Sequence, residues 1–182
     1  MNKEEITEDV FLVHSKSHDD NRGFFIESYN KNNFQKLGIN NEFIQDNISF
    51  SKSKNTIRGL HYQKKPFDQS KFVFVIKGSI LDVFVDVRPD SKSFGTYYSV
   101  TLDNPEKGLF LPKGFLHGFR TLEDNTIVGY KVDQIYKKEN EIGVFWNDKD
   151  LKINWNIDNK TPIVSKKDSN LLKWKEFIKE IN

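Results

Sequence analysis

Hydrophobic and polar residues alternate with a period of two over much of this 182-residue chain. Such alternation is typical of β-strands with one buried face and one solvated face. Short strands separated by turn residues at intervals of roughly ten positions predict a sandwich or a jelly-roll barrel. The tight connection at residues 77–79 predicts an antiparallel hairpin. The alternating segments are residues 25–30, 43–51, 71–78, 80–88, 96–102, 108–112 and 126–136.

Two other segments have a helical period. Residues 30–38 end at Gly38, which can adopt the left-handed conformation that stops a helix. Residues 169–181 place apolar side chains on one helical face, as a helix lying on a sheet requires. The apolar residues of that face are Leu171, Trp174, Ile178 and Ile181.

The composition is that of a single globular domain without disulfides. Hydrophobic residues make up 36% and charged residues 30%, and no linker-like stretch interrupts the chain, so we expect one globular domain over residues 1–182. The lack of cysteine excludes disulfides and thiolate metal ligands. The net charge of +2 is spread along the chain, which argues against a nucleic-acid partner. No apolar run approaches the roughly 20 residues of a membrane helix, and no signal-peptide pattern is seen, so we expect no membrane partner and a cytoplasmic protein.

Arginine is rare in this chain. Only four of the 28 basic residues are arginines, namely Arg22, Arg58, Arg88 and Arg120. A guanidinium can form two parallel hydrogen bonds with a carboxylate or a phosphate, which an ammonium cannot do. The arginines are therefore candidates for anion recognition.

The spacing around His61 resembles the metal-binding frame of cupin jelly rolls. That frame has His-x-His, a Glu seven positions before a Gly, and Pro-x-Gly-x-x-His. Here His61 and His117 occupy two histidine positions, but Gln63 and Lys71 occupy the other two ligand positions. An ammonium group has no lone pair for a metal. The pattern predicts a cupin frame without a metal, and the alternative is a chance spacing in a strand-rich chain.

Two histidines and a lysine that converge inside a barrel favour proton transfer and anion stabilisation. The alternative for His61 is a core histidine with a single hydrogen bond. Arg58 and His61 are three residues apart, so a regular strand would direct them to opposite faces. Gly59 between them permits a bulge that would bring both side chains to one face.

Three more residues have both a structural and a chemical interpretation. Tyr130 and Tyr136 are six apart, so a regular strand would present both on one face, either as barrel aromatics or as a phenolic acid opposite a base. Asp168 fits a capping box with Ser165. Alternatively, its carboxylate could accept a hydrogen bond from His61 and hold the tautomer of that ring. Sequence spacing leaves both questions open.

In their order along the chain, these motifs resemble the dTDP-4-dehydrorhamnose 3,5-epimerase family. They are HDDNRGFFIE, QDNISFS, RGLHYQ, LPKGFLHGF, YKVDQIY, EIGVFWND and PIVSKKD. The resemblance implies a mainly β fold, a cupin-type antiparallel jelly-roll barrel with a short helix in the N-terminal half and a C-terminal helix, and no cofactor. It also implies epimerisation at C3 and C5 of dTDP-4-dehydro-6-deoxy-D-glucose to dTDP-4-dehydro-L-rhamnose. The alternative is a single-carbon epimerase or a ketoisomerase that acts on another nucleotide 4-keto-6-deoxysugar.

The resemblance further implies a role for each catalytic candidate. His61 is similar to the catalytic base of the family and Asp168 to its carboxylate partner. Lys71 is similar to the residue that stabilises the developing oxyanion. Tyr130 is similar to the acid that returns a proton on the opposite face of the sugar.

The resemblance implies substrate contacts and a partner as well. The positions that match substrate-binding residues of the family are Arg22, Glu27, Gln45, Asn47, Arg58, His117, Tyr136, Glu141 and Lys166. The family forms homodimers in which the N-terminal segment crosses to the other subunit. Arg22 and Glu27 are therefore expected to serve the neighbouring site.

Overall fold

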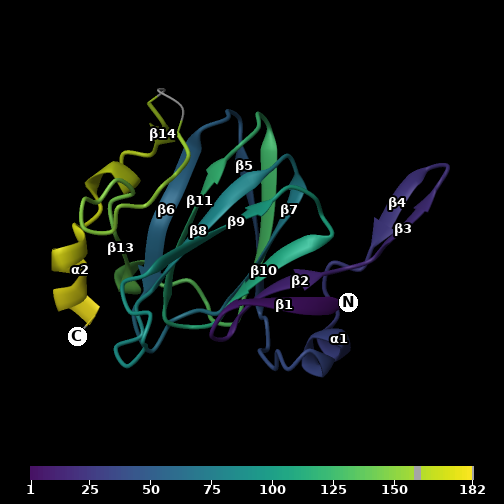
Figure 1. The fold of residues 1–182 in the computed structure, drawn as a ribbon, viewed down its shortest axis with the longest axis horizontal. Helices are drawn as coiled ribbons and strands as arrows, with labels where there is room; N and C mark the ends of the chain where they lie inside the picture. Colours follow the sequence, from purple (N-terminus) through teal and green to yellow (C-terminus); the bar gives the residue numbers. More distant parts are fainter. Residues whose placement is uncertain (158–160, 182) are drawn as a thin grey trace.

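The computed structural model describes residues 1–157 and 161–181 of the chain, and two antiparallel sheets face each other in it (Figure 1). This arrangement is a cupin-type jelly roll, as the alternating pattern and the resemblance predicted. The first sheet consists, in spatial order, of β1 (Asn2–Thr7), β2 (Val10–His14), β10 (Lys107–Leu111), β7 (Lys71–Lys77), β12 (Thr126–Val132) and β5 (Gln45–Ser51). The second consists of β13 (Glu141–Gly143), β6 (Thr56–Gln63), β11 (Phe115–Thr121), β8 (Ile80–Asp86) and β9 (Tyr97–Leu102), with β14 (Ile163–Val164) parallel to β6.

Several elements lie outside the two sheets. Strands β3 (Ser17–Asp20) and β4 (Gly23–Ile26) form a separate hairpin that projects from the barrel (Figure 1). Helix α1 (Lys31–Lys36) follows it, and the left-handed Gly38 ends this helix as predicted. Helix α2 (Trp174–Ile181) closes the described chain, and short 3₁₀ turns at Lys138–Asn140 and Asp168–Asn170 join other elements.

Strand β8 is buried along its whole length because both faces of its sheet are covered. Inside the barrel, Phe84 packs with a cluster that includes Leu109 and Phe115. On the outer face, Val83 and Val85 pack under the C-terminal segment, which contributes the residues Trp155, Trp174 and Phe177. Apolar packing therefore fills one half of the barrel interior and one outer face, which leaves the other half of the interior free for polar side chains.

Several predictions of local structure are wrong. Strands β7 and β8 lie in different sheets, so residues 77–79 cross between the sheets and do not form a hairpin. Strand β12 ends at Val132, so Tyr130 and Tyr136 do not share a strand. The segment at 25–30 forms a strand only as far as Ile26, where β4 ends.

The C-terminal helix begins later than predicted. It starts at Trp174, so Leu171 lies before the helix. Phe177, not included in the predicted apolar face, is fully buried beside Trp174. Among the described residues, no helix has the length and apolarity to cross a membrane.

Candidate active site

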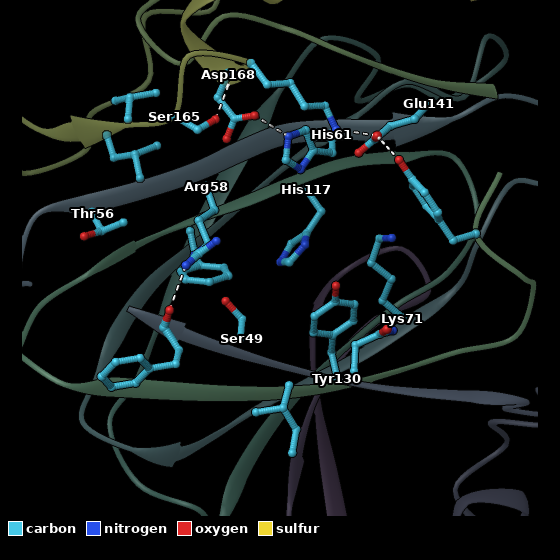
Figure 2. A pocket seen from close by; sticks show the side chains of 18 of the residues that line it. Ser49, Thr56, Arg58, His61, Lys71, His117, Tyr130, Glu141, Ser165 and Asp168 are labelled. Atoms are coloured by element: carbon cyan, nitrogen blue, oxygen red, sulfur yellow. Dashed lines mark hydrogen bonds and ion pairs between the residues drawn. The ribbon is translucent and has the colours of Figure 1, made fainter. Parts of the chain in front are cut away.

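A cavity of about 900 Å³ opens in the polar half of the barrel (Figure 2). Strands of both sheets line it, because inward-facing residues of β5, β7 and β12 face those of β6 and β11. The segment 163–168 closes one side. A concave polar pocket of this size inside a rigid scaffold is a suitable site for a small molecule.

His61 and Asp168 form a hydrogen-bonded pair on one wall of the cavity. His61 Nε2 lies 2.8 Å from Asp168 Oδ1, and the other carboxylate oxygen accepts the N–H of Gly59 at 3.1 Å. Burial works to raise the pKa of Asp168, but His61 and the Gly59 N–H outweigh it and lower the pKa. The ionised carboxylate places the ring proton on Nε2, so Nδ1 of His61 is left with a lone pair that can take a proton.

The local backbone explains why Arg58 and His61 both line the cavity. The pairing of β6 with β11 shifts by one residue between His117 and Phe119, opposite the segment from Arg58 to His61. Gly59 has φ +106°, and a Cβ there would lie 2.7 Å from the His117 carbonyl oxygen. The expected bulge is therefore confirmed, and it needs glycine for both conformation and space.

Asp168 has the partner that the chemical interpretation predicted. Its side chain is 6% exposed and contacts His61. One half of the capping box is present, since Ser165 Oγ accepts the Asp168 N–H at 3.0 Å. The Asp168 carboxylate bonds His61 and Gly59 instead, and helix α2 begins six residues later, so Asp168 does not cap that helix.

His117 forms a second histidine–aspartate pair, with Asp82. His117 Nε2 lies 2.9 and 3.1 Å from the two carboxylate oxygens of Asp82, a residue with no exposed surface. Burial raises the pKa of Asp82, and the attraction of His117 only partly opposes it. Sequence reasoning missed Asp82, although a carboxylate in the otherwise apolar run ILDVFV was a signal of a buried partner.

Lys71 and Tyr130 lie across the cavity from the His61–Asp168 pair (Figure 2). They project from the neighbouring strands β7 and β12 of the first sheet. Burial lowers the pKa of Lys71 to about 8, although Glu141 and Asp133 oppose the shift. Burial raises the pKa of Tyr130, so its phenol stays protonated at neutral pH.

Tyr136, Glu141 and Lys167 form a connected group at the edge of the cavity. The Tyr136 hydroxyl donates to Glu141 Oε2 at 2.7 Å, and Lys167 Nζ donates to the same oxygen. The hydrogen bond to Glu141 raises the pKa of Tyr136 to about 12. Burial works to raise the pKa of Glu141, but the bonds from Lys167 and Tyr136 lower it. Lys166, the residue named from the sequence, does not line the cavity, whereas its neighbour Lys167 does.

Polar residues of β5 and β6 line a further part of the wall. Gln45 and Asn47 face inward and share a hydrogen bond of 2.8 Å. Arg58 donates to Ser51 Oγ at 3.1 Å and to the Phe50 carbonyl at 2.8 Å. The same inward alternation continues to Ser49, whose buried hydroxyl has no protein partner among the described residues and which sequence reasoning missed.

Arg22 and Glu27 lie outside this cavity. Arg22 is at the tip of the β3–β4 hairpin, where it pairs with Asp20. Glu27 follows the hairpin and accepts hydrogen bonds from Asn30 and Asn33. Within one chain, the structure does not bring these two residues to the other candidates.

Known proteins resemble this chain over nearly its whole length. A sequence model of dTDP-4-dehydrorhamnose 3,5-epimerase matches residues 4–176. The enzyme of that name from Escherichia coli (strain K12) is 42% identical over 175 residues, which cover 94% of this chain and 93% of the relative. A Bacillus anthracis structure of such an epimerase with TDP and PPi bound superposes with a TM-score of 0.89 at 44% identity, covering 94% of this chain and 99% of the other.

A Legionella pneumophila dTDP-6-deoxy-D-glucose-3,5-epimerase in complex with dTDP-4-keto-L-rhamnose is also similar. Its TM-score is 0.89 at 33% identity, with 100% of this chain and 94% of the other covered. Fold and sequence agree in these comparisons. This chain belongs to the dTDP-4-dehydrorhamnose 3,5-epimerase family.

Proposed function

We propose that the protein is an isomerase that inverts C3 and C5 of dTDP-4-dehydro-6-deoxy-D-glucose to give dTDP-4-dehydro-L-rhamnose, without a cofactor. The observation that carries the proposal is the placement of a base and an acid on facing walls of one cavity. His61, backed by Asp168, projects from the second sheet, and Tyr130 projects from the first. A planar intermediate between these walls can lose a proton to one side and gain a proton from the other, which inverts the carbon.

The chemistry follows from the ketone at C4. Hydrogens on C3 and C5 are acidic because the electron pair left behind spreads onto the ketone oxygen as an enolate. Nδ1 of His61 takes the proton, and the ammonium of Lys71 stabilises the enolate oxygen. Lys71 keeps most of its charge at neutral pH because its pKa is about 8. Tyr130 then returns a proton to the opposite face of the carbon.

The nucleotide part of the substrate requires cationic and hydrogen-bonding groups. Arg58 offers N–H donors to the diphosphate, His117 stands on the same cavity wall, and Gln45 and Asn47 offer amides to the nucleoside. Tyr136 offers a half-exposed aromatic ring beside Glu141. On this wall we favour Lys167 over Lys166 as the substrate-binding lysine, because Lys167 lines the cavity.

A homodimer that exchanges its N-terminal hairpins would complete this site. Phe24 and Phe25 on the hairpin are 60% and 70% exposed. Ile48 and Phe50 on the edge strand β5, at the margin of the cavity, are 75% and 54% exposed. Apolar groups exposed on both a projecting hairpin and a sheet face fit an interface with a second copy, and the hairpin would carry Arg22 and Glu27 to the cavity of the partner.

Complementation between inactive variants tests the exchange. Arg22→Ala and His61→Ala proteins are purified separately, mixed under conditions that allow subunit exchange, and assayed. If Arg22 serves the neighbouring site, a mixed dimer contains one intact site and activity rises well above that of either variant. Activity that stays at the level of the separate variants contradicts hairpin exchange.

Hydrogen exchange at the sugar tests the reaction itself. The protein is incubated with dTDP-4-dehydro-6-deoxy-D-glucose in deuterated water, and the sugar hydrogens are followed by NMR. Deuterium at both C3 and C5 is the expected result, and deuterium at one carbon would indicate a single-carbon epimerase. No incorporation would refute the proposal. The cytoplasmic location, the lack of a cofactor and of a nucleic-acid partner, and the single domain stay predictions.

A further inference from the structure

Gln63 is the last residue of β6, and its buried side chain contacts backbone instead of lining the cavity. Nε2 donates to the Ile135 carbonyl oxygen at 3.0 Å and to the Phe67 carbonyl oxygen, and Oε1 accepts the Lys137 N–H at 2.8 Å. Both amide hydrogens and one acceptor lone pair are therefore used by main-chain groups. A primary amide supplies this combination of two donors and an acceptor, whereas a carboxylate supplies acceptors only.

Two of these contacts lie on either side of Tyr136. Strand β12 ends at Val132, so Tyr136 is beyond the sheet ladder and its backbone is not fixed by strand pairing. Ile135 and Lys137 are its immediate neighbours, and one side chain holds both of them.

The partner of the Tyr136 hydroxyl is located by the same residue. Glu141, which accepts that hydroxyl at 2.7 Å, is paired with Gln63 in the register of β13 and β6. The main chain of Gln63 thus faces Glu141, while its side chain fixes the loop that carries Tyr136. Gln63 therefore helps to position both the donor, Tyr136, and the acceptor, Glu141, of this hydrogen bond.

We propose that Gln63 is a positioning residue that holds the loop at residues 135–137 so that Tyr136 stands at the cavity. The effect on substrate rests on the proposed function, because Tyr136 contacts substrate only if the cavity binds the nucleotide sugar. The effect on the loop does not depend on it. This role also accounts for the amide at a position where metal-binding cupins have a histidine.

Amide hydrogen exchange tests the loop without any substrate. In Gln63→Leu, the Ile135 carbonyl and the Lys137 N–H lose a buried partner, so amides in residues 133–137 should exchange on the order of tenfold faster. Amides of β8 should change little. Gln35→Leu makes the same replacement at an exposed position of α1 and should leave the loop unchanged. Unchanged exchange in residues 133–137, or equal acceleration over the whole chain, would overturn the proposal.

A double-mutant cycle tests whether Gln63 acts through Tyr136. The dissociation constant of dTDP is measured for Gln63→Leu in the wild-type and the Tyr136→Ala backgrounds. We expect a roughly tenfold weakening in the first and none in the second. Equal weakening in both backgrounds would contradict a positioning role, since a general structural defect would not depend on Tyr136.

A second variant separates the two donors from the acceptor, and the unchanged amides of β8 report whether each variant is folded. Gln63→Glu keeps an acceptor for the Lys137 N–H but turns a carboxylate oxygen toward two carbonyl oxygens, so amides in residues 133–137 should exchange at least as fast as in Gln63→Leu, and dTDP should bind no more tightly than it does to Gln63→Leu. Values equal to wild type would refute the role of the two donors. If the loop responds as expected but no sugar is converted by the wild-type protein, the proposed function fails and the positioning role stands.

Discussion

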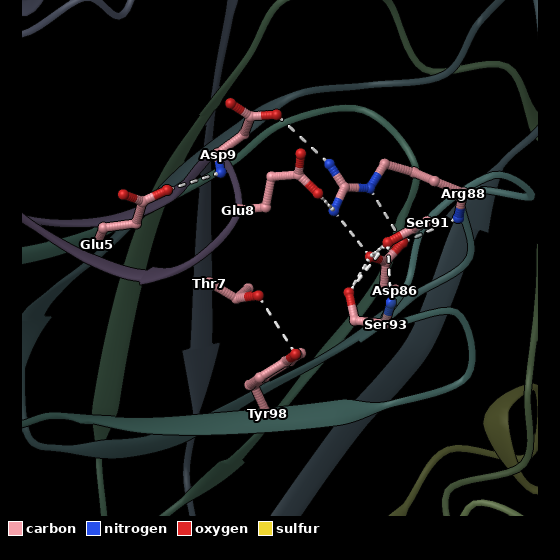
Figure 3. A network of polar contacts seen from close by, with 9 residues as sticks. All are labelled: Glu5, Thr7, Glu8, Asp9, Asp86, Arg88, Ser91, Ser93 and Tyr98. Atoms are coloured by element: carbon pink, nitrogen blue, oxygen red, sulfur yellow. Dashed lines mark hydrogen bonds and ion pairs between the residues drawn. The ribbon is translucent and has the colours of Figure 1, made fainter.

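Strand β8 carries two fully buried carboxylates, at opposite ends and on the same face, and they have different surroundings. Asp82 is paired with His117, which lines the cavity. Asp86, four residues later, accepts hydrogen bonds from Arg88 at 2.8 and 3.0 Å and from the hydroxyls of Ser91 and Ser93 at 2.6 Å each (Figure 3).

The difference lies in what the partners can do. Burial works to raise the pKa of Asp86, but Arg88 and the two serines outweigh it and lower the pKa, so the carboxylate is ionised at neutral pH. Arg88 also contacts Asp9 in the turn between β1 and β2, which links the β1–β2 turn to the end of β8. Asp82 has a single titratable partner beside the cavity, and burial raises its pKa. One end of the strand is therefore built for rigidity and the other for chemistry.

The largest expected effect concerns His61, and it should leave stability alone. His61→Asn removes the proposed base while preserving a polar side chain of similar size, so kcat should fall by about 10³-fold or more, within the usual range for a positioned base. Initial rates measured with the nucleotide sugar check this. Urea unfolding should give a free energy close to that of wild type, and a loss of kcat below about tenfold would contradict the role of His61.

At Asp86 we expect the opposite result, a loss of stability with little loss of activity. Asp86→Asn leaves Arg88 without its carboxylate and should lower the free energy of unfolding by about 3 kcal/mol. The folded pKa of Asp86 is lowered, so its stabilisation is present above the unfolded pKa and is lost as pH falls through the folded pKa. Urea unfolding at pH 7 and at acidic pH should therefore show the variant and wild type converging in acid, while kcat at pH 7 stays within about twofold. A large loss of kcat in the folded variant would erase the contrast between the two ends.

Asp82→Asn should show the reverse pattern from Asp86→Asn. His117 loses a charged partner, and we expect kcat/KM to fall by about 10- to 100-fold. The folded pKa of Asp82 is raised, so its contribution to stability is full below the unfolded pKa and is lost as pH rises. The substitution removes a buried carboxyl whose ionisation burial opposes, and urea unfolding at pH 7 should show no loss of stability. A drop similar to that of Asp86→Asn would mean that the two carboxylates have the same role.

The smallest effect concerns pH. With a pKa of about 8, Lys71 should lose its charge as pH rises, and kcat should decline by about fivefold between pH 8 and pH 9. Lys71→Met should have a lower kcat throughout and lack this decline. A decline that persists unchanged in Lys71→Met would assign the titration to another group.

Much of the site could be read from the sequence because it lies on strands with regular alternation. Gln45 and Asn47 are two residues apart on β5, so their side chains lie on the same face of the strand, and both face inward. Ser49 follows the same rule and was overlooked for lack of a motif. Tyr136 was named from the family resemblance, whereas the strand alternation that would place it beside Tyr130 does not hold, since β12 ends four residues earlier. Neither Asp82 nor Lys167 could be singled out, because their roles depend on which residues of other elements face them.

The sequence alone was enough to predict most of the strands, the bulge at Gly59 and the family, because these depend on local periodicity, on one special backbone conformation and on ordered motifs. The packing of distant elements was needed to show that residues 77–79 change sheets and that Asp168 contacts His61 across 107 positions of the chain, a pair that the resemblance only implied. The same holds for the contrast between Asp82 and Asp86. In the sequence, each is an aspartate in an apolar strand. Their chemistry differs because long-range packing places the imidazole of His117 beside Asp82, whereas the turn after β8 places the guanidinium of Arg88 beside Asp86.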